Sequence, residues 1–314
     1  MKARAQVCVV LTNYNGSQNR VLETCLGTLT ETLKNTNADI SLIIVDDCSQ
    51  DDSLEVINKF ALGGLNQLQV LNLKEPPFLS SCNLDVTASL NFGIRYVFRE
   101  HPGCEYVVTL DNDIALSANF LQEMVQRAQC SDGRTGMFAS NQYLLDDYPE
   151  KSRHRSTGHY MKRAGATLDI DFLDESKHQG KKILCPCFSG ALFKTAMLRD
   201  VGLVPEYYRH YNNCSEIGFR AHLKGWNVEF VESAVMWHKQ PNEISPEKRR
   251  DIEISRLWNI LRFFPSDRID EALGLYESEH DRHNLIQEAK DACPTLPCFG
   301  DKTKLYEEFV SING

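Results

Sequence analysis

The chain has 314 residues and a mass of 35.7 kDa, which is enough for two domains or for one large α/β unit. With 42% apolar and 25% charged residues, the composition is that of a folded globular protein, and a net charge of −9 argues against a protein that mainly binds a polyanion. No apolar stretch approaches the ~20 residues that a membrane-spanning helix needs, and the first residues lack the apolar core of a secretion signal.

Strand-like and helix-like segments alternate in the first half of the chain. Short apolar runs predict strands over Gln6–Leu11, Ser41–Val45, Gln69–Leu73 and Tyr106–Leu110. Helical periodicity predicts helices between them, over Val21–Leu33, around Leu54–Phe60 and over Leu84–Phe98. Apolar strands joined by amphipathic helices predict an α/β fold in which helices flank a mostly parallel sheet.

The second half has a different pattern. Between Ser140 and Pro186 it indicates loops and a few antiparallel strands, and from Pro246 onward helix-forming residues dominate. We therefore expect a mixed second half of the sheet and a helical C-terminal tail.

Three polar loops follow predicted strands, namely Thr12–Asn15, Asp46–Ser49 and Asp111–Asp113. Ligands of parallel α/β sheets bind beyond the carboxyl ends of the strands. The loops therefore predict one ligand site at this edge of the sheet. Neither a G-x-G-x-x-G motif after the first strand nor a P-loop motif is present, which argues against a dinucleotide enzyme or a P-loop ATPase.

Asp111-Asn112-Asp113 is the sharpest motif. Two carboxylates one residue apart after a strand can hold Mg²⁺ or Mn²⁺, because these hard cations prefer oxygen ligands and bind substrate phosphates. The alternative is an acidic turn that caps a helix starting near Ser117.

Asp46 and Asp47 follow the second strand. A carboxylate in this place can accept a hydrogen bond from a uracil or thymine imide or from a ribose hydroxyl. The alternative is a turn into a helix that begins near Asp52.

Eight segments of the chain form an ordered set of motifs, namely Val9–Asn15, Ile43–Ser49, Asn91-Phe92-Gly93, Asp111–Asp113, Ser189–Phe193, Leu198–Leu203, Arg220–Trp226 and Ala234–His238. Together they resemble the motifs of family-2 glycosyltransferases. The resemblance extends from about Val7 to His238, and the joint order of the motifs is more specific than any single one. It implies a GT-A fold, a nucleotide-sugar donor and Mn²⁺ or Mg²⁺.

The resemblance also implies roles for individual residues. Tyr14 would stack on the base, Asp113 would be the direct metal ligand, and His238 would be a second ligand, unless it is only a hydrogen-bonded histidine beside Trp237. The expected donor-binding residues are Thr12, Asn13, Tyr14, Asn15, Asp46, Asp47, Asn91 and Asp111, with Asp111 on the ribose or the metal. Gly190 and Trp237 would belong to the acceptor side.

We accordingly divide the chain into three parts. Residues 1–115 would bind the nucleotide sugar, and residues 116–240 would form the acceptor-binding half of the same domain. Residues 241–314 would be a helical C-terminal extension. The acceptor would be a carbohydrate, a glycolipid or another hydroxyl compound, with a nucleic acid left open.

One position departs from the family pattern. The family carries an aspartate, its general base, about six residues before the arginine that matches Arg220, and here Cys214 stands at that position. The nearby acid is Glu216, which is the leading candidate for the base unless it only forms an i,i+4 ion pair with Arg220. The inverting mechanism of the family therefore depends on an acid that the motif does not supply.

The segment Lys151–Arg163 carries five Lys/Arg, two His and no acid. It is a solvated loop, a cover for the donor diphosphate, or a site for an anionic acceptor. Eleven cysteines without zinc-finger spacing predict reduced thiols and a cytoplasmic protein, with peripheral membrane contact left open.

The leading interpretation is a metal-dependent glycosyltransferase that uses UDP or dTDP sugars. A nucleotidyltransferase would share the nucleotide-binding half and the acidic metal site, but would not need the Ser189–Phe193 and Trp237-His238 segments. A nucleotide-sugar-binding protein without turnover is favoured by the missing acid at Cys214.

Overall fold

The computed structural model describes residues 4–61, 68–75, 85–178, 181–240, 244–279, 283–294 and 300–310. Its strands are β1 Gln6–Asn13, β2 Asp39–Asp46, β3 Leu68–Asn72, β4 Tyr106–Asp111, β5 Ile114–Leu116, β6 Thr135–Leu144, β7 His154–Ser156, β8 His159–Met161, β9 Thr167–Asp169, β10 Gly190–Lys194 and β11 Asn227–His238. Its α-helices are α1 Val21–Lys34, α2 Ser53–Ala61, α3 Asp85–Glu100, α4 Phe120–Cys130, α5 Glu175–His178, α6 Thr195–Val201, α7 Asn213–Leu223, α8 Pro246–Phe263, α9 Ser266–Glu279, α10 His283–Asp291 and α11 Lys302–Phe309.

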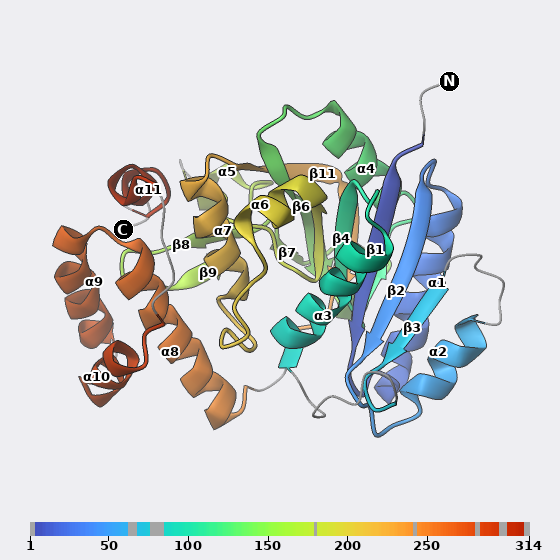
Figure 1. Ribbon diagram of the computed structural model, residues 1–314, viewed down its shortest axis with the longest axis horizontal. Helices are drawn as coiled ribbons and strands as arrows, with labels where there is room; N and C mark the ends of the chain where they lie inside the picture. The colour runs from blue at the N-terminus through green and yellow to red at the C-terminus, as the bar shows by residue number, and fades with distance from the viewer. Residues whose placement is uncertain are drawn as a thin grey trace.

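Most strands belong to one sheet in the order β3-β2-β1-β4-β10-β6-β11-β5, and β7 pairs with β6. The first four strands are parallel, whereas β10 is antiparallel to both β4 and β6. Strands β8 and β9 form a separate hairpin. Figure 1 shows the parallel strands β1–β3 at one end of the molecule and the C-terminal helices α8–α11 at the other. The predicted α/β fold with a mostly parallel sheet is confirmed.

Alternate residues of the parallel strands face opposite sides of the sheet, as the two-residue period of a strand requires. Val7, Val9 and Leu11 of β1 pack in the core that contains the apolar faces of α1 and α4. Cys8 and Val10 face the other core, which contains α3. Because both faces are covered, these strands are continuously apolar rather than alternating.

The predicted strands and helices of the first half are present, with ends displaced by one or a few residues. The third strand runs over Leu68–Asn72 rather than Gln69–Leu73, and the helix predicted from Leu84 begins at Asp85 among the described residues. The interval between Ser140 and Pro186 holds the short strands β7, β8 and β9 in addition to the end of β6. The predicted helical tail is present as α8–α11.

The C-terminal helices share a core with the sheet domain. Phe263, Phe264 and Tyr276 of this region are fully or almost fully buried in the same apolar cluster as Phe219 of α7 and Phe193 of β10. Phe219 and Phe263 stack with ring centroids 4.7 Å apart. Helix α8 is therefore attached to α7 by aromatic packing.

Among the described residues, no helix combines the length and the apolar character that crossing a lipid bilayer requires. The nine described cysteines are free thiols, and six of them are buried.

Candidate active site

The register of the parallel strands brings the three predicted loops together. Thr12 of β1 lies beside Asp111 of β4, and Asn13 lies beside Asp46 of β2. The Thr12 hydroxyl donates to Asp111 Oδ1 at 3.3 Å, and the Asn13 amide donates to Asp46 Oδ1 at 2.6 Å. The carboxyl ends of β1, β2 and β4 thus form one polar edge.

A cavity of about 450 Å³ opens at this edge. Its lining includes Thr12, Asn13, Tyr14, Asp47, Asp111 and Asp113 from the predicted donor and metal site. The Tyr14 side chain is 46% exposed, so its ring is accessible to a ligand. This volume lies within the ~300–1,000 Å³ that is typical of small-molecule sites.

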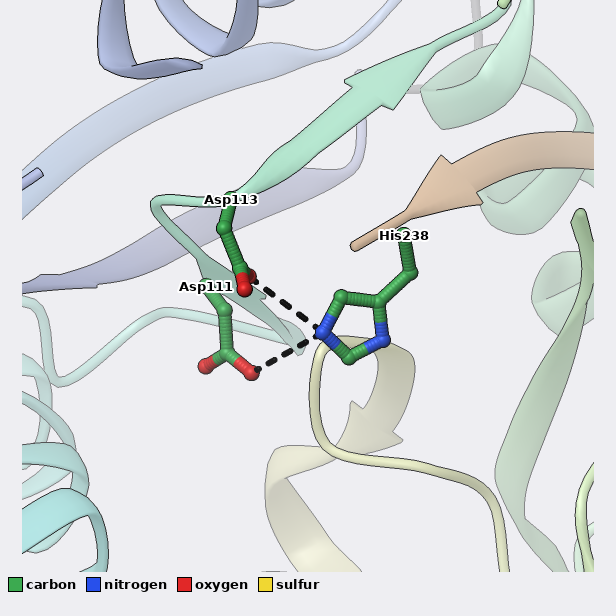
Figure 2. Close-up of side chains that lie close together, drawn as sticks. All are labelled: Asp111, Asp113 and His238. Atoms are coloured by element: carbon green, nitrogen blue, oxygen red, sulfur yellow. Dashed lines mark ion pairs between the residues drawn. The ribbon is translucent and has the colours of Figure 1, made fainter. Parts of the chain in front are cut away.

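Asp111 and Asp113 of the cavity lining converge with His238, and one ligand atom from each of the three lies within 4.8 Å of the others (Figure 2). His238 ends β11, and its antiparallel pairing with Ile114 of β5 places the ring next to Asp113. The Nε2 atom lies 3.3 Å from Asp113 Oδ1 and 4.0 Å from Asp111 Oδ2. Asp111–Asp113 leads into β5, and α4 begins at Phe120, so the helix-cap alternative does not describe the motif.

The electrostatics of this group suit a cation. Burial and the neighbouring Asp113 raise the pKa of Asp111 to about 7. Burial lowers the pKa of His238, but its hydrogen bonds with Asp113 and Cys187 outweigh burial and raise the pKa to about 9. The group therefore holds protons at neutral pH, and a divalent cation would take their place. The two carboxylates are the hard oxygen donors that Mn²⁺ and Mg²⁺ prefer, and His238 would add one nitrogen donor.

The other ring nitrogen of His238 has two neighbours. The Ser189 hydroxyl lies 3.1 Å from Nδ1, and a guanidinium nitrogen of Arg155 lies 2.5 Å from it. Arg155 also donates to Gln142 Oε1 at 2.8 Å. One arginine of the basic segment Lys151–Arg163 thus reaches the candidate metal group.

Three other charged or titratable residues of that segment have acidic partners. Arg153 pairs with Asp147, His154 lies 3.1 Å from Asp171, and His159 lies 3.2 Å from Asp169. The segment forms the edge strands β7 and β8 rather than one continuous solvated loop.

Four predicted site residues have structural contacts instead of a place in the cavity lining. Asp46 is fully buried and accepts from the backbone and the hydroxyl of Ser49, as the turn alternative expects. The backbone amide of Asn15 donates to the same hydroxyl. Asn91 donates to the Val204 carbonyl at 2.7 Å. Trp237 is buried and donates to the Glu150 carbonyl at 2.6 Å.

Gly190 also has a packing role. A Cβ atom at this position would collide with the sulfur of Met236 and lie 2.9 Å from the Ser140 hydroxyl. The absence of a side chain lets β10 pass close to side chains of β6 and β11. Of the two acceptor-side predictions, neither Gly190 nor Trp237 lines the cavity.

Glu216, the candidate base, and Cys214, at the family's base position, lie outside the cavity lining as well. Glu216 is fully buried; it accepts from Arg220 Nε at 2.8 Å, Arg220 Nη2 at 2.7 Å and Arg262 Nη2 at 3.1 Å. Both of its oxygens are therefore engaged, and the ion-pair alternative describes Glu216. Burial raises the pKa of the Cys214 thiol well above its ordinary value, so Cys214 is a protonated thiol at neutral pH. We remove both residues from the candidate bases.

The cavity also contains residues that sequence reasoning missed. One wall holds Asp85 of α3 with Arg209 and His210, whose side chains both pair with Asp85. A second wall is the first turns of α8, with lining residues Ser245, Glu247, Lys248 and Asp251. No local motif indicates either wall, because the residues that form the walls are far apart in the sequence: Arg209 and α8 lie more than 120 residues after Asp85.

Comparisons with known proteins agree with this architecture. The family model described as Glycosyl transferase family 2 matches residues 8–202, more than half of the chain. The comparison with curated proteins finds no match.

Solved structures of similar fold include S. aureus TarS, at a TM-score of 0.56 and 15% identity over 88% of this chain and 44% of TarS. The chain thus spans less than half of that protein. A 1–349 fragment of TarS in complex with UDP-GlcNAc gives 0.56 and 15%, over 92% of this chain and 82% of the fragment. Mannosyltransferase PcManGT from Pyrobaculum calidifontis, in complex with GDP-Man and Mn²⁺, gives 0.56 and 15%, over 95% of this chain and 78% of that one.

Proposed function

The chain belongs to glycosyl transferase family 2, and on that premise we propose that it moves a sugar from a UDP or dTDP donor to an acceptor hydroxyl. We further propose that the transfer needs Mn²⁺ or Mg²⁺ and inverts the anomeric carbon. The observation that carries this proposal is the convergence of Asp111, Asp113 and His238, of which the two aspartates line a cavity together with Thr12, Tyr14 and Asp47.

The preference for a pyrimidine rests on Asp47. Its carboxylate group belongs to a buried residue at the cavity wall, where it can accept the imide N–H of uracil or thymine. A site built for one hydrogen-bond pattern leaves buried groups unpaired when another base enters, so guanine would bind less tightly. The structurally similar proteins are in complex with UDP-GlcNAc in one case and with GDP-Man in the other, so this preference needs its own test.

Each wall of the cavity would contribute to the reaction. Tyr14 would stack on the base, and Arg209 and Lys248 would supply positive charge at the cavity wall. A divalent cation held by Asp111, Asp113 and His238 would supply positive charge beside the diphosphate leaving group. The acceptor hydroxyl would attack the anomeric carbon as the diphosphate departs, and a general base would take its proton.

The acceptor class stays a proposal: a carbohydrate, a glycolipid or another hydroxyl compound, with a nucleic acid as an open alternative. The cytoplasmic location likewise stays a prediction from cysteine usage.

A calorimetric and thermal-shift screen tests the proposal directly. UDP, dTDP, GDP and their sugar conjugates are titrated with and without Mn²⁺, and release of the nucleoside diphosphate is followed for each donor. We expect Mn²⁺-dependent binding, tighter for UDP or dTDP than for GDP, followed by release of that diphosphate. Tighter binding of GDP would refute the assignment of the base pocket. Release of pyrophosphate would indicate a nucleotidyltransferase, and binding without any release would indicate a binding protein.

A further inference from the structure

The first two turns of α3 place two polar residues in the wall of the cavity. Asp85 and Ser89 both line the cavity, and they lie four residues apart in α3. Residues with this spacing belong to the same face of a helix. A ligand in the cavity would therefore lie against this face of α3.

The Ser89 hydroxyl is buried without a partner. Ser89 is 2% exposed, and its oxygen has no hydrogen-bond partner among the described residues. This is unfavourable, because a buried hydroxyl has lost its hydrogen bonds to water. A hydroxyl group of a ligand at this wall would supply the missing partner.

Asp85 presents a fixed carboxylate one turn before Ser89. Its side chain is 9% exposed; Arg209 Nε pairs with Oδ2, and His210 Nε2 lies 3.2 Å from Oδ1. A carboxylate has about four lone-pair positions, so each oxygen can accept a further hydrogen bond from a ligand. Arg209 and His210 line the same cavity, so the pair holds the carboxylate at the place where a ligand would meet it.

Hydrogen bonds tie the start of α3 to the segment that carries Arg209 and His210. The backbone N–H of Thr87 donates to the Arg209 carbonyl at 3.2 Å, and its hydroxyl donates to the Tyr208 carbonyl. The Asn213 amide of α7 donates to the same hydroxyl at 3.0 Å. The wall is therefore formed before a ligand binds, which lowers the entropy that binding costs.

The proposed placement of the donor leaves this wall for the sugar. Tyr14 and Asp47 are the proposed contacts of the base, and the candidate metal group lies beside the diphosphate. The walls that remain belong to α3 and α8. On α8 the Ser245 hydroxyl already accepts from the Lys248 backbone, whereas on α3 the Ser89 hydroxyl has no described partner. The α3 wall is thus the better match for the remaining part of the donor, the sugar.

The charges of the lining favour an uncharged sugar. Among the described lining residues two are cationic, Arg209 and Lys248, and six are acidic, namely Asp47, Asp85, Asp111, Asp113, Glu247 and Asp251. Burial lowers the pKa of His210, so its ring is neutral at neutral pH. The charge of a divalent cation would be matched by that of the diphosphate. A carboxylate on the sugar would therefore meet like charges, whereas sugar hydroxyls can donate to Asp85.

Building on the transfer function proposed above, we propose that Asp85 and Ser89 bind hydroxyl groups of the donor sugar and that this sugar is uncharged. One sugar hydroxyl donates to the Asp85 carboxylate, and another is the hydrogen-bond partner of the Ser89 hydroxyl. Arg209 and His210 position Asp85. Because a site built to bind a hydroxyl has unpaired buried groups when that hydroxyl is missing, the α3 wall selects the sugar as Asp47 selects the base.

Calorimetry separates the contribution of the sugar from that of the nucleotide. UDP, UDP-glucose, UDP-galactose and UDP-N-acetylglucosamine are titrated into the full chain with Mn²⁺, and dTDP and dTDP-glucose are titrated in the same way. For the sugar nucleotide that the wild type binds most tightly, Asp85→Asn should raise Kd by roughly 10–100-fold. The Kd for the nucleoside diphosphate without a sugar should stay within about twofold of the wild-type value, because Asp85 contacts the sugar alone.

Ser89→Ala gives a second measurement that does not disturb the Asp85 pair. It should raise the Kd for the same sugar nucleotide by roughly 2–10-fold. The melting temperature of the ligand-free variant should equal or exceed that of the wild type, because the lost hydroxyl has no described partner in the free protein. A lower melting temperature with unchanged affinity would make Ser89 a structural residue and contradict the proposal.

Glu206→Gln is the matched control. Glu206 belongs to the segment that carries Arg209 and pairs with Arg95 of α3 at 2.7 Å, and neither member of this pair lines the cavity. The variant removes an ion pair between the same two parts of the chain and should leave every affinity unchanged. Equal losses of sugar-nucleotide affinity in Glu206→Gln and Asp85→Asn would indicate a loosened wall rather than a lost contact and would overturn the assignment.

UDP-glucuronic acid tests the charge, because it differs from UDP-glucose by a carboxylate in place of a CH₂OH group. The wild type should bind it at least about tenfold more weakly than UDP-glucose, and equal or tighter binding would overturn the uncharged sugar. Unchanged affinities for every sugar nucleotide in both Asp85→Asn and Ser89→Ala would overturn the sugar site. A wild-type protein that binds donors but releases no nucleoside diphosphate would overturn the proposed transfer alone, since the affinities decide the sugar site without turnover.

Discussion

The buried carboxylate of Glu216 gives the sharpest stability prediction. Glu216→Gln keeps the size of the side chain but replaces one acceptor oxygen by an NH₂ donor and removes the negative charge. Arg220 and Arg262 then face each other without the anion that lies between them, and the Arg262 side chain is only 4% exposed. Its other described side-chain hydrogen bond is to the neutral hydroxyl of Tyr208 at 3.0 Å.

Removing one partner of a buried ion pair costs about 3–5 kcal/mol, because the remaining charge stays buried and uncompensated. Three charge-assisted hydrogen bonds to one fully buried carboxylate place Glu216 within that range rather than below it. At ~2–4 °C per kcal/mol for a chain of this class, the melting temperature should fall by roughly 6–20 °C. Well below that temperature, kcat should stay near the wild-type value because Glu216 does not line the cavity.

Thermal and urea unfolding measure the first quantity, and nucleotide release at a low temperature measures the second. Glu271→Gln is the matched control, since Glu271 pairs with Arg268 at 3.2 Å with both side chains about half exposed. The loss of that exposed pair should cost at most about 1 kcal/mol. Normal stability of Glu216→Gln combined with a large loss of kcat would refute this reasoning and return Glu216 to the role of base.

Three further predictions concern the metal group and one motif. Asp113→Asn should abolish the Mn²⁺-dependent part of nucleotide binding in calorimetry and leave the melting temperature of the metal-free protein nearly unchanged; equal affinity with Mn²⁺ present would rule out Asp113 as a ligand. Because Asp111 and His238 have pKa values of about 7 and about 9, Mn²⁺ displaces one proton between these values and two below pH 7. The affinity for Mn²⁺ should thus fall about tenfold for each unit by which the pH is lowered from about 9 to about 7, and more steeply below about 7. An affinity that stays constant from about pH 6 to about pH 8 would contradict this expectation. Gly93→Ala should lower the free energy of unfolding by about 1–3 kcal/mol in urea, because the added methyl group would collide with Val10 and lie 3.0 Å from Val45; unchanged stability would mean that α3 can move away from the sheet.

The polar edge of the sheet could be predicted because it depends on short-range patterns. Apolar strands separated by helices predict a parallel sheet, and a parallel sheet places the ends of its strands at one edge. Thr12, Asp47 and Asp111 therefore come together from the strand pattern alone. The contact of His238 with Asp113 depends on the antiparallel pairing of β11 with β5, which the sequence did not predict. His238 was a candidate ligand only through the resemblance to the family.

The remaining parts depend on contacts between distant segments. Arg262 is 46 residues from Glu216, and nothing near either residue shows that a second arginine completes the ion pair. Likewise, Asn91 is predicted to bind the donor, yet its side chain donates to the Val204 carbonyl, and Gly93 of the same motif packs against the sheet. A sequence motif indicates that such residues are important, but it does not distinguish a residue that packs from one that binds a ligand.

The place of α8 has a consequence for how this protein can be divided. The family model ends at residue 202, yet Ser245, Glu247, Lys248 and Asp251 form one wall of the cavity. The same helix supplies Arg262 to the carboxylate of α7 and Phe263 to the aromatic stack with Phe219. A fragment limited to the family-matched residues would lack this wall of the cavity, and it would also lack α7 and the candidate metal ligand His238 of β11. Chimeras that exchange acceptor or donor preferences with other members of the family should therefore keep the sheet and α8 from the same parent.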